Sequence, residues 1–393
     1  MGKKVDIIIL IISRIIINII SIFIKSKDNI WIFGSWYGKN YSDHPRLLFE
    51  YMTEHKEDHC IDTLVWISKS RKLHTELKAM GINSVYYTSL RSIYYHIFAS
   101  NYVYSQSVEV DFNRYFINNS LKTNLWHGFP LKKIGKISQP LEKRTSILHR
   151  IVNFLTYREQ SFVSYSKLYE ETIVKAFALN ADHIIEGPSI RNVHKTRHYL
   201  KDECELRAEL LKEKNARKKI VFYLPTFRDT RVDRFLNASE RDVDLFLKNC
   251  QSNNVCFVTK GHFANSDNKT LDLDKLINIK DTVDISSVLD LCDVLVTDYS
   301  SVYFDFLYYN KPIIFYSYDL DFYCNEDRGL IFDYDEMTPG DKVKDISHLM
   351  SAILNNILKD KYTSKRNEIK SIIFENNENL SKFINRVNNR IHH

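Results

Sequence analysis

The sequence predicts an α/β protein with two Rossmann-like domains, each built on a parallel sheet. Short apolar runs alternate along the chain with longer helical patterns, which is typical of parallel sheets covered by helices on both faces. The chain has 393 residues, more than one ordinary hydrophobic core organises, so two domains are expected. Hydrophobic residues make up 44% and charged residues 26%, which is the composition of a globular protein.

The candidate strands form two series. The first series consists of the runs at residues 29–33, 62–67, 83–88, 101–105, 123–127, 161–165 and 182–187. The second consists of the runs at residues 219–225, 254–260, 293–298 and 311–317. The charged segment 200–219 lies between them and indicates a solvated helix that leads into the second domain. We therefore expect an N-terminal segment over 1–26, one Rossmann-like domain over 27–205, and a second over 206–393 that ends in helices.

The N-terminal segment is predicted to be an amphipathic helix that associates with a membrane. Residues 7–24 are largely apolar and about as long as the shortest membrane span. Arg14, Asn18, Ser21 and Lys25 recur at spacings that place them on one helical face. An in-plane helix could turn this stripe to the lipid headgroups and avoid the cost of an arginine at the bilayer centre, about 2.5–3.5 kcal/mol. A single span, or a helix buried in the protein or a partner, stays open.

Charge and cysteine content narrow the functional class. The net charge of +6 fits an acidic ligand or an anionic membrane surface. The basic residues are dispersed, however, so a nucleic-acid partner is not expected. The six cysteines form no CxxC pair and no zinc spacing, which indicates buried free thiols in the cytoplasm. Neither GxGxxG nor GxxxxGK[ST] occurs, and no carboxylate cluster suggests a metal, so we expect no cofactor.

His127 lies in NLWHGFP, where a short apolar run ends at a turn. A histidine at the carboxyl end of a strand is placed to meet a ligand, and it can accept a proton at neutral pH. Gly128 would let a substrate approach the backbone closely. The basic pair Lys132 and Lys133 follows. A structural histidine that caps the turn is the alternative explanation.

A second loop, TDYSS, follows a buried strand and begins a helix. Ser300 or Ser301 could cap that helix, whose N-terminus offers free N–H groups and partial positive charge. With Thr297 and Asp298 beside it, this start of a helix predicts a cradle for a phosphate or diphosphate. Ordinary helix capping is the alternative.

Two further loops place polar and cationic side chains at strand ends. In VTKGHF, Lys260 and His262 follow a buried strand and suit phosphate oxygens or a developing charge. In YLPTFRDT, Thr226 and Arg228 follow another strand, and arginine binds phosphate in bidentate fashion. Surface solvation could explain either loop alone.

Two weaker elements follow the last expected strand of each domain. EGPSIRNVH carries Arg191 and Asn192 after the first domain. NEDRGLIFDYDEMTPG carries Arg328 and Gly329 after the second. Neither element indicates a function alone.

In order along the chain, these motifs resemble the CDP-glycerol:poly(glycerophosphate) glycerophosphotransferase family, the teichoic-acid-type primases and polymerases. The resemblance covers about residues 120–342, and its most specific part is the string TDYSS…FDF…KPI.FY. It implies a GT-B-like fold, with an N-terminal acceptor domain and a C-terminal CDP-donor domain whose parallel sheets face across a cleft.

The resemblance also implies a reaction. An alditol phosphate, expected to be glycerol phosphate with ribitol phosphate open, passes from a CDP-alditol to a hydroxyl of a lipid-linked saccharide or polymer, and CMP is released. His127 would be the general base, and His262 would contact the donor diphosphate or stabilise the transition state. Ser300 and Ser301 match the donor-phosphate loop. Further donor contacts are expected at Thr226, Arg228, Lys260, Thr297, Asp298 and Arg328. Acceptor or supporting positions are expected at Gly128, Lys132, Arg191, Asn192 and Asp305.

These expectations place the enzyme peripherally on the cytoplasmic face of the cell membrane, in teichoic-acid or capsule-type polymer synthesis. Within the same fold, the alternative is a nucleotide-sugar glycosyltransferase that acts on a cell-surface glycan. A membrane scaffold that retains an inactive transferase fold is the non-enzymatic alternative. Assembly into a homo-oligomer stays open.

Overall fold

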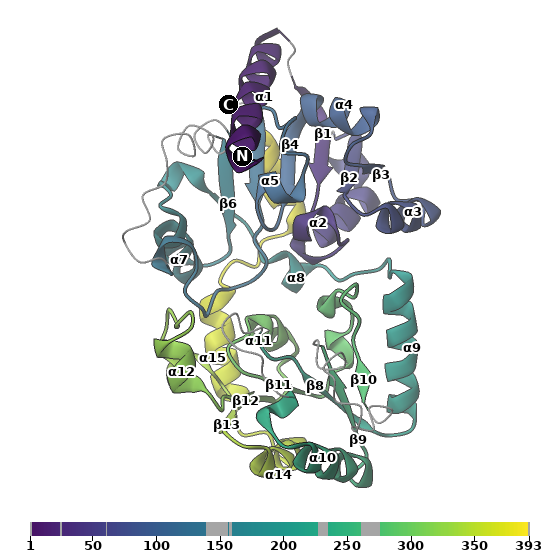
Figure 1. Cartoon of the computed structure of the whole chain (residues 1–393), viewed down its shortest axis with the longest axis vertical. Coiled ribbons are helices and arrows are strands. Elements are labelled where there is room, and N and C mark those ends of the chain that lie inside the picture. Colours follow the sequence, from purple (N-terminus) through teal and green to yellow (C-terminus); the bar gives the residue numbers. More distant parts are fainter. Residues whose placement is uncertain are drawn as a thin grey trace. The chain divides into compact units, whose positions relative to one another are not determined.

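The structure is a computed structural model that describes residues 2–23, 26–59, 61–138, 156, 159–226, 235–260 and 276–391. The chain divides into two compact units (Figure 1). Unit 1 comprises Met1–His127, Gln139–His198 and Phe374–His393, and unit 2 comprises Gly128–Ser138 and Tyr199–Ile373. Both ends of the chain therefore belong to unit 1, and the segment that directly follows His127 belongs to unit 2.

Unit 1 contains a parallel sheet that, within the described residues, has the strand order β3-β2-β1-β4-β5-β6-β7. Its strands are β1 (Lys27–Phe33), β2 (Thr63–Ser68), β3 (Ser84–Tyr86), β4 (Ala99–Tyr104), β5 (Leu121–Asn124), β6 (Gln160–Ser164) and β7 (Ile184–Glu186). Its helices are α1 (Gly2–Phe23), α2 (Asp43–Glu54), α3 (Arg71–Ala79), α4 (Leu90–Phe98), α5 (Val108–Asp111), α7 (Lys167–Phe177), α8 (Ile190–Val193) and α16 (Leu380–Ile391).

The central strand β1 shows why this sheet forms. Ile30, Trp31, Ile32 and Phe33 are all buried, so the strand is covered on both faces, as a parallel sheet requires. On one face, Ile30 and Ile32 pack in a cluster with residues of β2, β4 and α5. The apolar run of β1 is therefore continuous rather than alternating. The carboxyl end of β1 lies at the edge of the sheet where the candidate site is found.

Unit 2 contains a second parallel sheet, with the order β10-β9-β8-β11-β12-β13 in the part of the chain that the structure describes. Its strands are β8 (Lys219–Tyr223), β9 (Val255–Thr259), β10 (Ile277–Asn278), β11 (Val294–Thr297), β12 (Ile313–Tyr316) and β13 (Asp341–Val343). Its helices are α9 (Lys201–Asn215), α10 (Glu240–Ser252), α11 (Val302–Phe306), α12 (Leu320–Asn325), α13 (Tyr334–Met337), α14 (Ile346–Leu358) and α15 (Thr363–Ile373).

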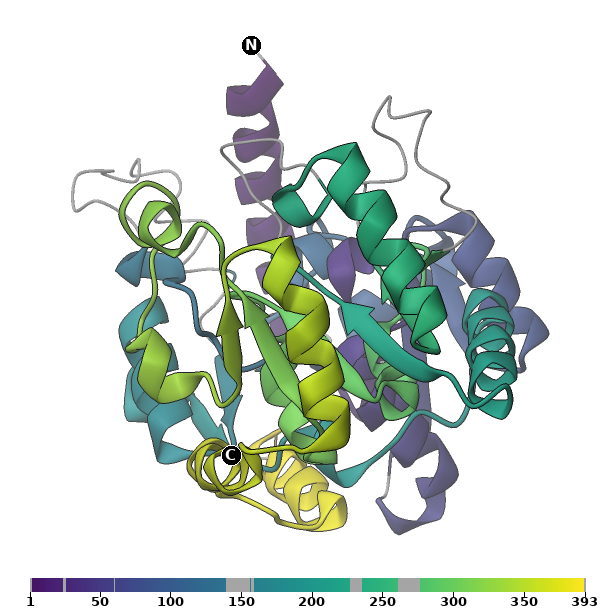
Figure 2. The same ribbon diagram turned by 90° about the horizontal axis from the view of Figure 1, so that it is seen from below.

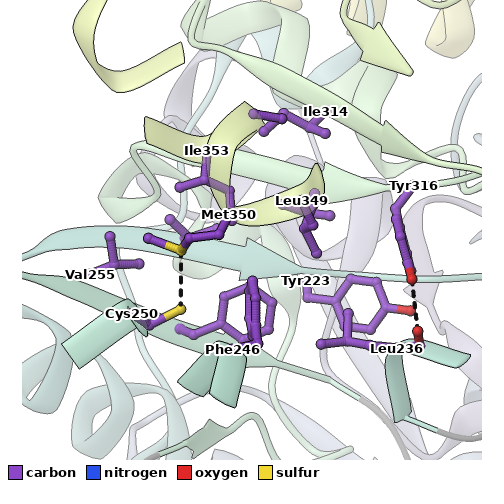
Figure 3. Packing of buried hydrophobic residues seen from close by; sticks show 14 of the residues in the cluster. Tyr223, Leu236, Phe246, Cys250, Val255, Ile314, Tyr316, Leu349, Met350 and Ile353 are labelled. Atoms are coloured by element: carbon purple, nitrogen blue, oxygen red, sulfur yellow. Dashed lines mark hydrogen bonds between the residues drawn. The ribbon is translucent and has the colours of Figure 1, made fainter. Parts of the chain in front are cut away.

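Helices α10 and α14 cover one face of the sheet in unit 2 (Figure 2). Phe246 and Cys250 of α10 meet Met350 of α14 over the strands, and the Cys250 and Met350 sulfur atoms lie 3.9 Å apart (Figure 3). At the border of this core, the Tyr316 hydroxyl donates to the Leu236 carbonyl at 2.8 Å. The two parallel sheets with helical cover confirm the predicted α/β class.

The predicted strands all occur, but two short edge strands were missed. β10 has two residues and β13 three, and in β13 only Val343 is buried. Neither strand carries an apolar run that a sequence pattern could detect. The prediction that residues 325–340 follow the last strand of the second domain is wrong, because β13 comes after them.

Burial of the cysteines was predicted correctly only in part. Cys250, Cys256 and Cys292 are buried and free, whereas Cys204 and Cys324 are free but exposed. Cys204 lies on α9, a charged helix with an exposed face, which explains its exposure. Position 60, the remaining cysteine, lies outside the described residues.

The N-terminal helix α1 forms as predicted, but Arg14 faces the protein together with Leu10 and Ile17. Arg14 is buried, and its Nη1 donates to the Ile117 carbonyl at 2.7 Å. Arg114 pairs with Asp6 near the start of the helix at 2.5 Å. The prediction that Arg14 faces lipid headgroups is therefore wrong, because the arginine is buried in unit 1, bonded to the Ile117 carbonyl and 4.0 Å from the Glu109 carboxylate.

The opposite side of α1 is apolar and open. Seven of its side chains, each about half exposed, share this side: Val5, Ile8, Ile9, Ile12, Ile15, Ile16 and Ile19. Among the described residues, no helix combines the length and apolar character that crossing a bilayer requires.

Candidate active site

The candidate site in unit 1 is built on three neighbouring strands. β4 lies between β1 and β5, and all three run parallel, so their carboxyl ends meet at one edge of the sheet. A short 3-10 turn, η1 (Trp36–Gly38), follows β1, Ser105 follows β4, and Trp126 and His127 follow β5. This edge is where ligands bind in open α/β sheets.

His127 is held in one orientation by its neighbours. Its Nδ1 lies 3.3 Å from the Ser105 carbonyl oxygen. Because a carbonyl only accepts, Nδ1 carries the proton in the neutral ring, and Nε2 is left with its lone pair. The Trp126 ring lies against the imidazole at 4.3 Å, and the Trp36 ring lies 5.9 Å away. The half-buried imidazole is thus presented as a proton acceptor.

A buried carboxylate that the sequence analysis missed ties this site together. Asp43, the first residue of α2, accepts from Arg191 Nη2 at 2.5 Å and from Trp36 Nε1 at 3.1 Å. Arg191, on α8, also donates through Nη1 to the His127 carbonyl at 3.4 Å. Asp43 therefore connects the turn after β1 to the backbone of His127. The predicted position Arg191 belongs to the site, with its charge directed at Asp43.

Asn192, the neighbouring predicted position, is half-buried on α8. Its Nδ2 atom is buried and has no hydrogen-bond partner among the described residues. A buried amide donor without a partner is costly, about 1–3 kcal/mol, so a ligand oxygen there would be stabilising.

Strained backbone surrounds His127. Trp36, Tyr37, Asp43 and Trp126 have φ values of 45°, 61°, 71° and 54°. Each such residue costs of order 1–3 kcal/mol, and the strain persists only where the surrounding contacts enforce it. Because strained residues of this kind cluster at functional sites, their position around His127 supports its assignment.

A second buried carboxylate, Asp111, joins the loops after β1 and β4. Its Oδ1 accepts from the Tyr37 N–H at 2.8 Å, and its Oδ2 accepts from the N–H groups of Gln106 and Ser105 at 2.9 and 3.3 Å. Burial raises the pKa of Asp111 to about 6, against the opposing effect of these bonds and of the Lys69 charge. Asp111 thereby fixes the carbonyl that holds His127.

His44 and Lys69 lie beside these carboxylates. Burial, then the charges of Arg191 and His127, hold the pKa of His44 well below its usual value, so His44 is neutral at neutral pH. Burial also lowers the pKa of Lys69 to about 8, and its Nζ donates to the Val110 carbonyl at 2.5 Å.

In unit 2, the segment after His127 pairs with a second predicted motif. Lys132 forms an antiparallel bridge with Leu330. Beside this bridge, the Ile331 N–H donates to the Leu131 carbonyl at 2.9 Å, and the Lys133 N–H donates to the Gly329 carbonyl at 3.1 Å. Gly128, at φ 140°, begins this segment. The structure therefore brings the basic pair of the first motif to the RGLIF motif.

Aromatic packing fixes the same segment to the serine loop. The Phe129 ring lies 4.7 Å from Phe304 of α11 and 5.7 Å from Phe332. Arg328 is exposed two residues before Leu330, which forms the bridge with Lys132, and Asp305 is half-buried within α11. Three motifs far apart in sequence thus meet in unit 2.

The polar residues at the ends of β8 and β11 bond to each other. Thr297 Oγ1 donates to the Leu224 carbonyl at 2.7 Å. Asp298 is buried, and its Oδ1 accepts from the N–H groups of Thr226 and Tyr299 at 2.8 and 2.5 Å. Thr297, Asp298 and Thr226 therefore join the two loops.

The serines of TDYSS are half-buried, and the expected cap does not form. Ser301 is the residue before α11, and its side chain makes no capping hydrogen bond. Its φ of −63° and ψ of −11° are already helical, whereas a capping residue needs extended backbone. The predicted side-chain cap is therefore wrong, and the hydroxyls of Ser300 and Ser301 are not used for capping α11.

Lys260 is placed at the carboxyl end of β9, as predicted. Its Nζ donates to the Val283 carbonyl at 2.6 Å, and burial lowers its pKa while Asp284, Asp281 and Glu203 oppose that effect. The predicted positions 228 and 262 lie outside the described residues. Among the residues that are described, no group of three or more histidine, cysteine or acidic side chains is placed to hold a metal ion.

Comparison with known proteins decides the family. Residues 16–393 match the family described as CDP-glycerol:poly(glycerophosphate) glycerophosphotransferase. The chain belongs to this family. As a family member it is an enzyme of the CDP-glycerol glycerophosphotransferase type, and transfer of glycerol phosphate in teichoic acid synthesis is consistent with its relatives.

Two of those relatives are a teichoic acid poly(glycerol phosphate) polymerase of Bacillus spizizenii and a teichoic acid glycerol-phosphate transferase of Staphylococcus aureus. The first is 29% identical over 360 residues, which cover 87% of each chain. The second is 29% identical over 339 residues, which cover 83% of this chain and 84% of the relative. A structure of the wall teichoic acid polymerase TagF soaked with CDPG matches with a TM-score of 0.72 at 24% identity, over 93% of this glycerophosphotransferase and 89% of TagF. This likeness shows that the two share the GT-B-like fold.

Sequence reasoning found His127 in this glycerophosphotransferase but missed the residues that hold it. Trp36 and Asp43 lie in GSWYGKNYSDHP, directly after β1. A signal was present, since two aromatic residues before a glycine at a strand end are unusual for a solvated turn. The carboxylates gave no such signal, because aspartate is common in turns.

Proposed function

We propose that the chain transfers glycerol phosphate from CDP-glycerol to a hydroxyl of a lipid-linked acceptor and releases CMP, in the synthesis of a teichoic-acid or capsule-type polymer. The observation that carries this proposal is the state of His127. Its Nδ1 is held by the Ser105 carbonyl, and its ring lies against Trp126, so Nε2 can take a proton from an attacking hydroxyl. Family membership supplies the donor class.

In the proposed reaction, the acceptor oxygen attacks the phosphorus that carries the glycerol. A new P–O bond forms while the bond from that phosphorus to the CMP oxygen breaks. His127 Nε2 takes the hydroxyl proton, and CMP leaves with the electron pair as an anion. Transfer of this kind depends on positioning and charge neutralisation more than on covalent chemistry.

We assign the donor to unit 2. The hydroxyls of Ser300 and Ser301 and the exposed guanidinium of Arg328 would bind the diphosphate, and Lys260 would add positive charge near the end of β9. The buried Thr226, Thr297 and Asp298 would support those loops through the bonds described above. The roles of the histidine at 262 and the arginine at 228 are carried over from the family motifs.

We assign the acceptor to unit 1, with Arg191 and Asn192 in support of His127. Gly128 and Lys132 follow His127 and would act at the same step of acceptor binding, and Asp305 would orient the serine loop through α11. The finer choice of glycerol over ribitol is supported by the family description and by the two relatives named above.

We further propose that the enzyme lies on the cytoplasmic face of the cell membrane and binds it through α1. The support is the row of seven half-exposed aliphatic side chains from Val5 to Ile19. Their spacing of three and four residues places them on one helical face. A contiguous apolar face of this kind marks an interaction surface, and a helix of this type lies in the membrane interface.

The test of the reaction is CMP release from CDP-glycerol by the full chain with a lipid-linked saccharide acceptor, followed by mass analysis of the product. His127→Ala should lower kcat by at least about 100-fold, which is the usual contribution of a general base. His348→Ala, at an exposed histidine on α14, is the control and should leave the rate unchanged. Undiminished CMP release by the His127 variant would remove the base assignment.

The donor is tested separately by thermal protection with CDP-glycerol, CDP-ribitol, UDP-glucose and CMP-sialic acid. At equal ligand concentrations CDP-glycerol should raise the unfolding temperature most, because the stabilisation of the folded state grows with the ratio of ligand concentration to Kd. Stronger protection by UDP-glucose would instead indicate a nucleotide-sugar glycosyltransferase.

A further inference from the structure

Trp36 and Tyr37, two aromatic residues on the turn after β1, are exposed, and the Trp36 ring lies 5.9 Å from that of His127. Trp36 is 40% exposed and Tyr37 is 54% exposed. Aromatic residues usually contribute to stability by burial, which these two forgo in part. Their rings belong to the turn directly after β1, whose neighbour across β4 is the loop of His127.

The fold holds these two rings in place against backbone strain. Both residues adopt left-handed backbone, at φ 45° and 61°, where glycine or asparagine would be favoured. The turn is held because Asp111 accepts from the Tyr37 N–H at 2.8 Å and Asp43 accepts from Trp36 Nε1 at 3.1 Å. The Lys69 N–H also donates to the carbonyl at the end of the turn, at 2.6 Å. Buried groups therefore hold two partly exposed aromatic residues on this turn, of which Trp36 has its ring near His127.

Lys39, which directly follows the turn, is exposed, but the other cations around the turn are engaged, which disfavours a chain of phosphates as the occupant. Arg191 is paired with Asp43. Lys69 donates its Nζ to the Val110 carbonyl, and burial lowers its pKa to about 8. A poly(glycerol phosphate) acceptor is acyclic and carries one negative charge per unit, so it would require several cations and would offer no ring face. A sugar ring offers an apolar face for stacking and hydroxyls at its edge.

We propose that Trp36 and Tyr37 form the platform on which the terminal sugar ring of a lipid-linked saccharide acceptor stacks. This inference rests on the proposed function and deepens it, because it names the acceptor class that His127 serves. The platform makes the enzyme one that adds glycerol phosphate to a saccharide end, in preference to the end of an existing glycerol phosphate chain. The hydroxyl at the ring edge is the one whose proton passes to His127.

Tyr37 gives the clean test, because its side chain forms no hydrogen bond within the described residues while that of Trp36 also holds Asp43. The acceptors are a disaccharide on a short alkyl diphosphate and a glycerol phosphate trimer on the same alkyl diphosphate. Tyr37→Ala should raise KM for the disaccharide acceptor about five- to tenfold, as expected for loss of one aromatic contact, with kcat unchanged. Tyr37→Phe should behave like the wild type, and so should Tyr94→Ala, an exposed tyrosine on α4.

A binding measurement separates this inference from the transfer reaction. Titration of the disaccharide without donor should change tryptophan fluorescence in the wild type, and the affinity should fall about five- to tenfold in Tyr37→Ala. If the wild type binds the disaccharide in this way but releases no CMP, the proposed reaction fails and the platform stands. Equal KM increases for both acceptors, or unchanged disaccharide affinity in Tyr37→Ala, would overturn the platform. It is also overturned if saccharide-free phospholipid vesicles show the same Tyr37-dependent binding, since the rings would then contact lipid.

Discussion

Replacing Asp43 with asparagine tests whether the buried ion pair positions the catalytic histidine. In the folded protein the Asp43 side chain is 1% exposed and that of Arg191 is 12% exposed. Asp43→Asn keeps the shape of the side chain and tolerates the φ of 71°, because asparagine adopts left-handed backbone readily. The variant therefore removes the negative charge with little change in packing or strain, and leaves Arg191 uncompensated.

The expected loss follows from the burial of the pair. Removing one partner of a buried ion pair costs about 3–5 kcal/mol, since the remaining charge stays desolvated. Arg191 keeps its bond to the His127 carbonyl and a small exposed fraction, so we expect the lower end, about 3 kcal/mol. The kcat for CMP release should fall at least about tenfold, because a slight displacement of a catalytic group is costly in rate. The KM for CDP-glycerol should be unchanged.

Stability is measured by urea unfolding with tryptophan fluorescence. All 4 tryptophans of the chain lie within the ranges of unit 1, so this signal follows unit 1 alone. A double-mutant cycle of Asp43→Asn with Arg191→Gln should give a coupling energy of about 2–3 kcal/mol. The control cycle, Glu54→Gln with Arg197→Gln, breaks a more exposed pair 3.0 Å apart and should give at most about 1 kcal/mol. A coupling below about 0.5 kcal/mol for the Asp43 cycle would refute the reasoning.

Three further predictions concern unit 1. Burial raises the pKa of Asp111 from 3.8 to about 6. The contribution of the protonated carboxyl to the free energy of unfolding is therefore full below pH 3.8 and is lost as the pH rises through about 6. Asp111→Asn should remove this pH-dependent change of about 3 kcal/mol in the free energy of unfolding. If urea unfolding gave the same dependence of this free energy on pH for the wild type and the variant, the prediction would be contradicted. Gly38→Ala should destabilise unit 1 by about 1–2 kcal/mol more than Gly81→Ala. Both glycines have positive φ, but only at Gly38 would a Cβ lie 2.8 Å from the Asp111 carbonyl oxygen, while nothing lies within 4 Å at Gly81, and equal losses would exclude the close contact as the cause. Ile12→Ser with Ile16→Ser should weaken binding to anionic phospholipid vesicles about 30-fold in sedimentation assays, since both side chains would leave the lipid.

The vesicle experiment has a matched control. Leu90 of α4 and Leu358 of α14 are 85% and 84% exposed and belong to other helices than α1. Serine at both leucines removes comparable apolar surface and should leave vesicle binding unchanged. Equal loss of binding in both double variants would show that α1 is not the membrane contact.

Most of the fold could be predicted because its strands are buried on both faces. β1 and β8 carry apolar runs that stand out from the polar segments around them. β10 and β13 could not be found in this way, since a strand of two or three residues with little burial leaves no pattern. Their existence depends on hydrogen bonds to β9 and β12, which sequence reading does not show.

The candidate site could be predicted only where the local sequence around a residue already indicates a function. His127 does so, because a histidine at a strand end is unusual. Asp43 does not, because its partner Arg191 is 148 residues away and only the parallel order of the strands brings them together. The same holds for Asp111, which meets Tyr37 across 74 residues. A carboxylate in a turn is ordinary until its distant partner is known.

Helix α1 shows a different limit and supplies an argument about the membrane. The periodicity of its residues reveals two unlike faces, but it does not reveal which face meets the protein. In a water-soluble helix the apolar face is inside. Here Leu10 and Ile17 are inside with Arg14, which is bonded to the Ile117 carbonyl, and a second apolar face from Val5 to Ile19 is outside. Exposing such a face to water is unfavourable, by about 25 cal/mol for each Å² of apolar surface, so the arrangement is stable where another apolar medium covers it. This second, exposed apolar face favours lipid contact through the isoleucines.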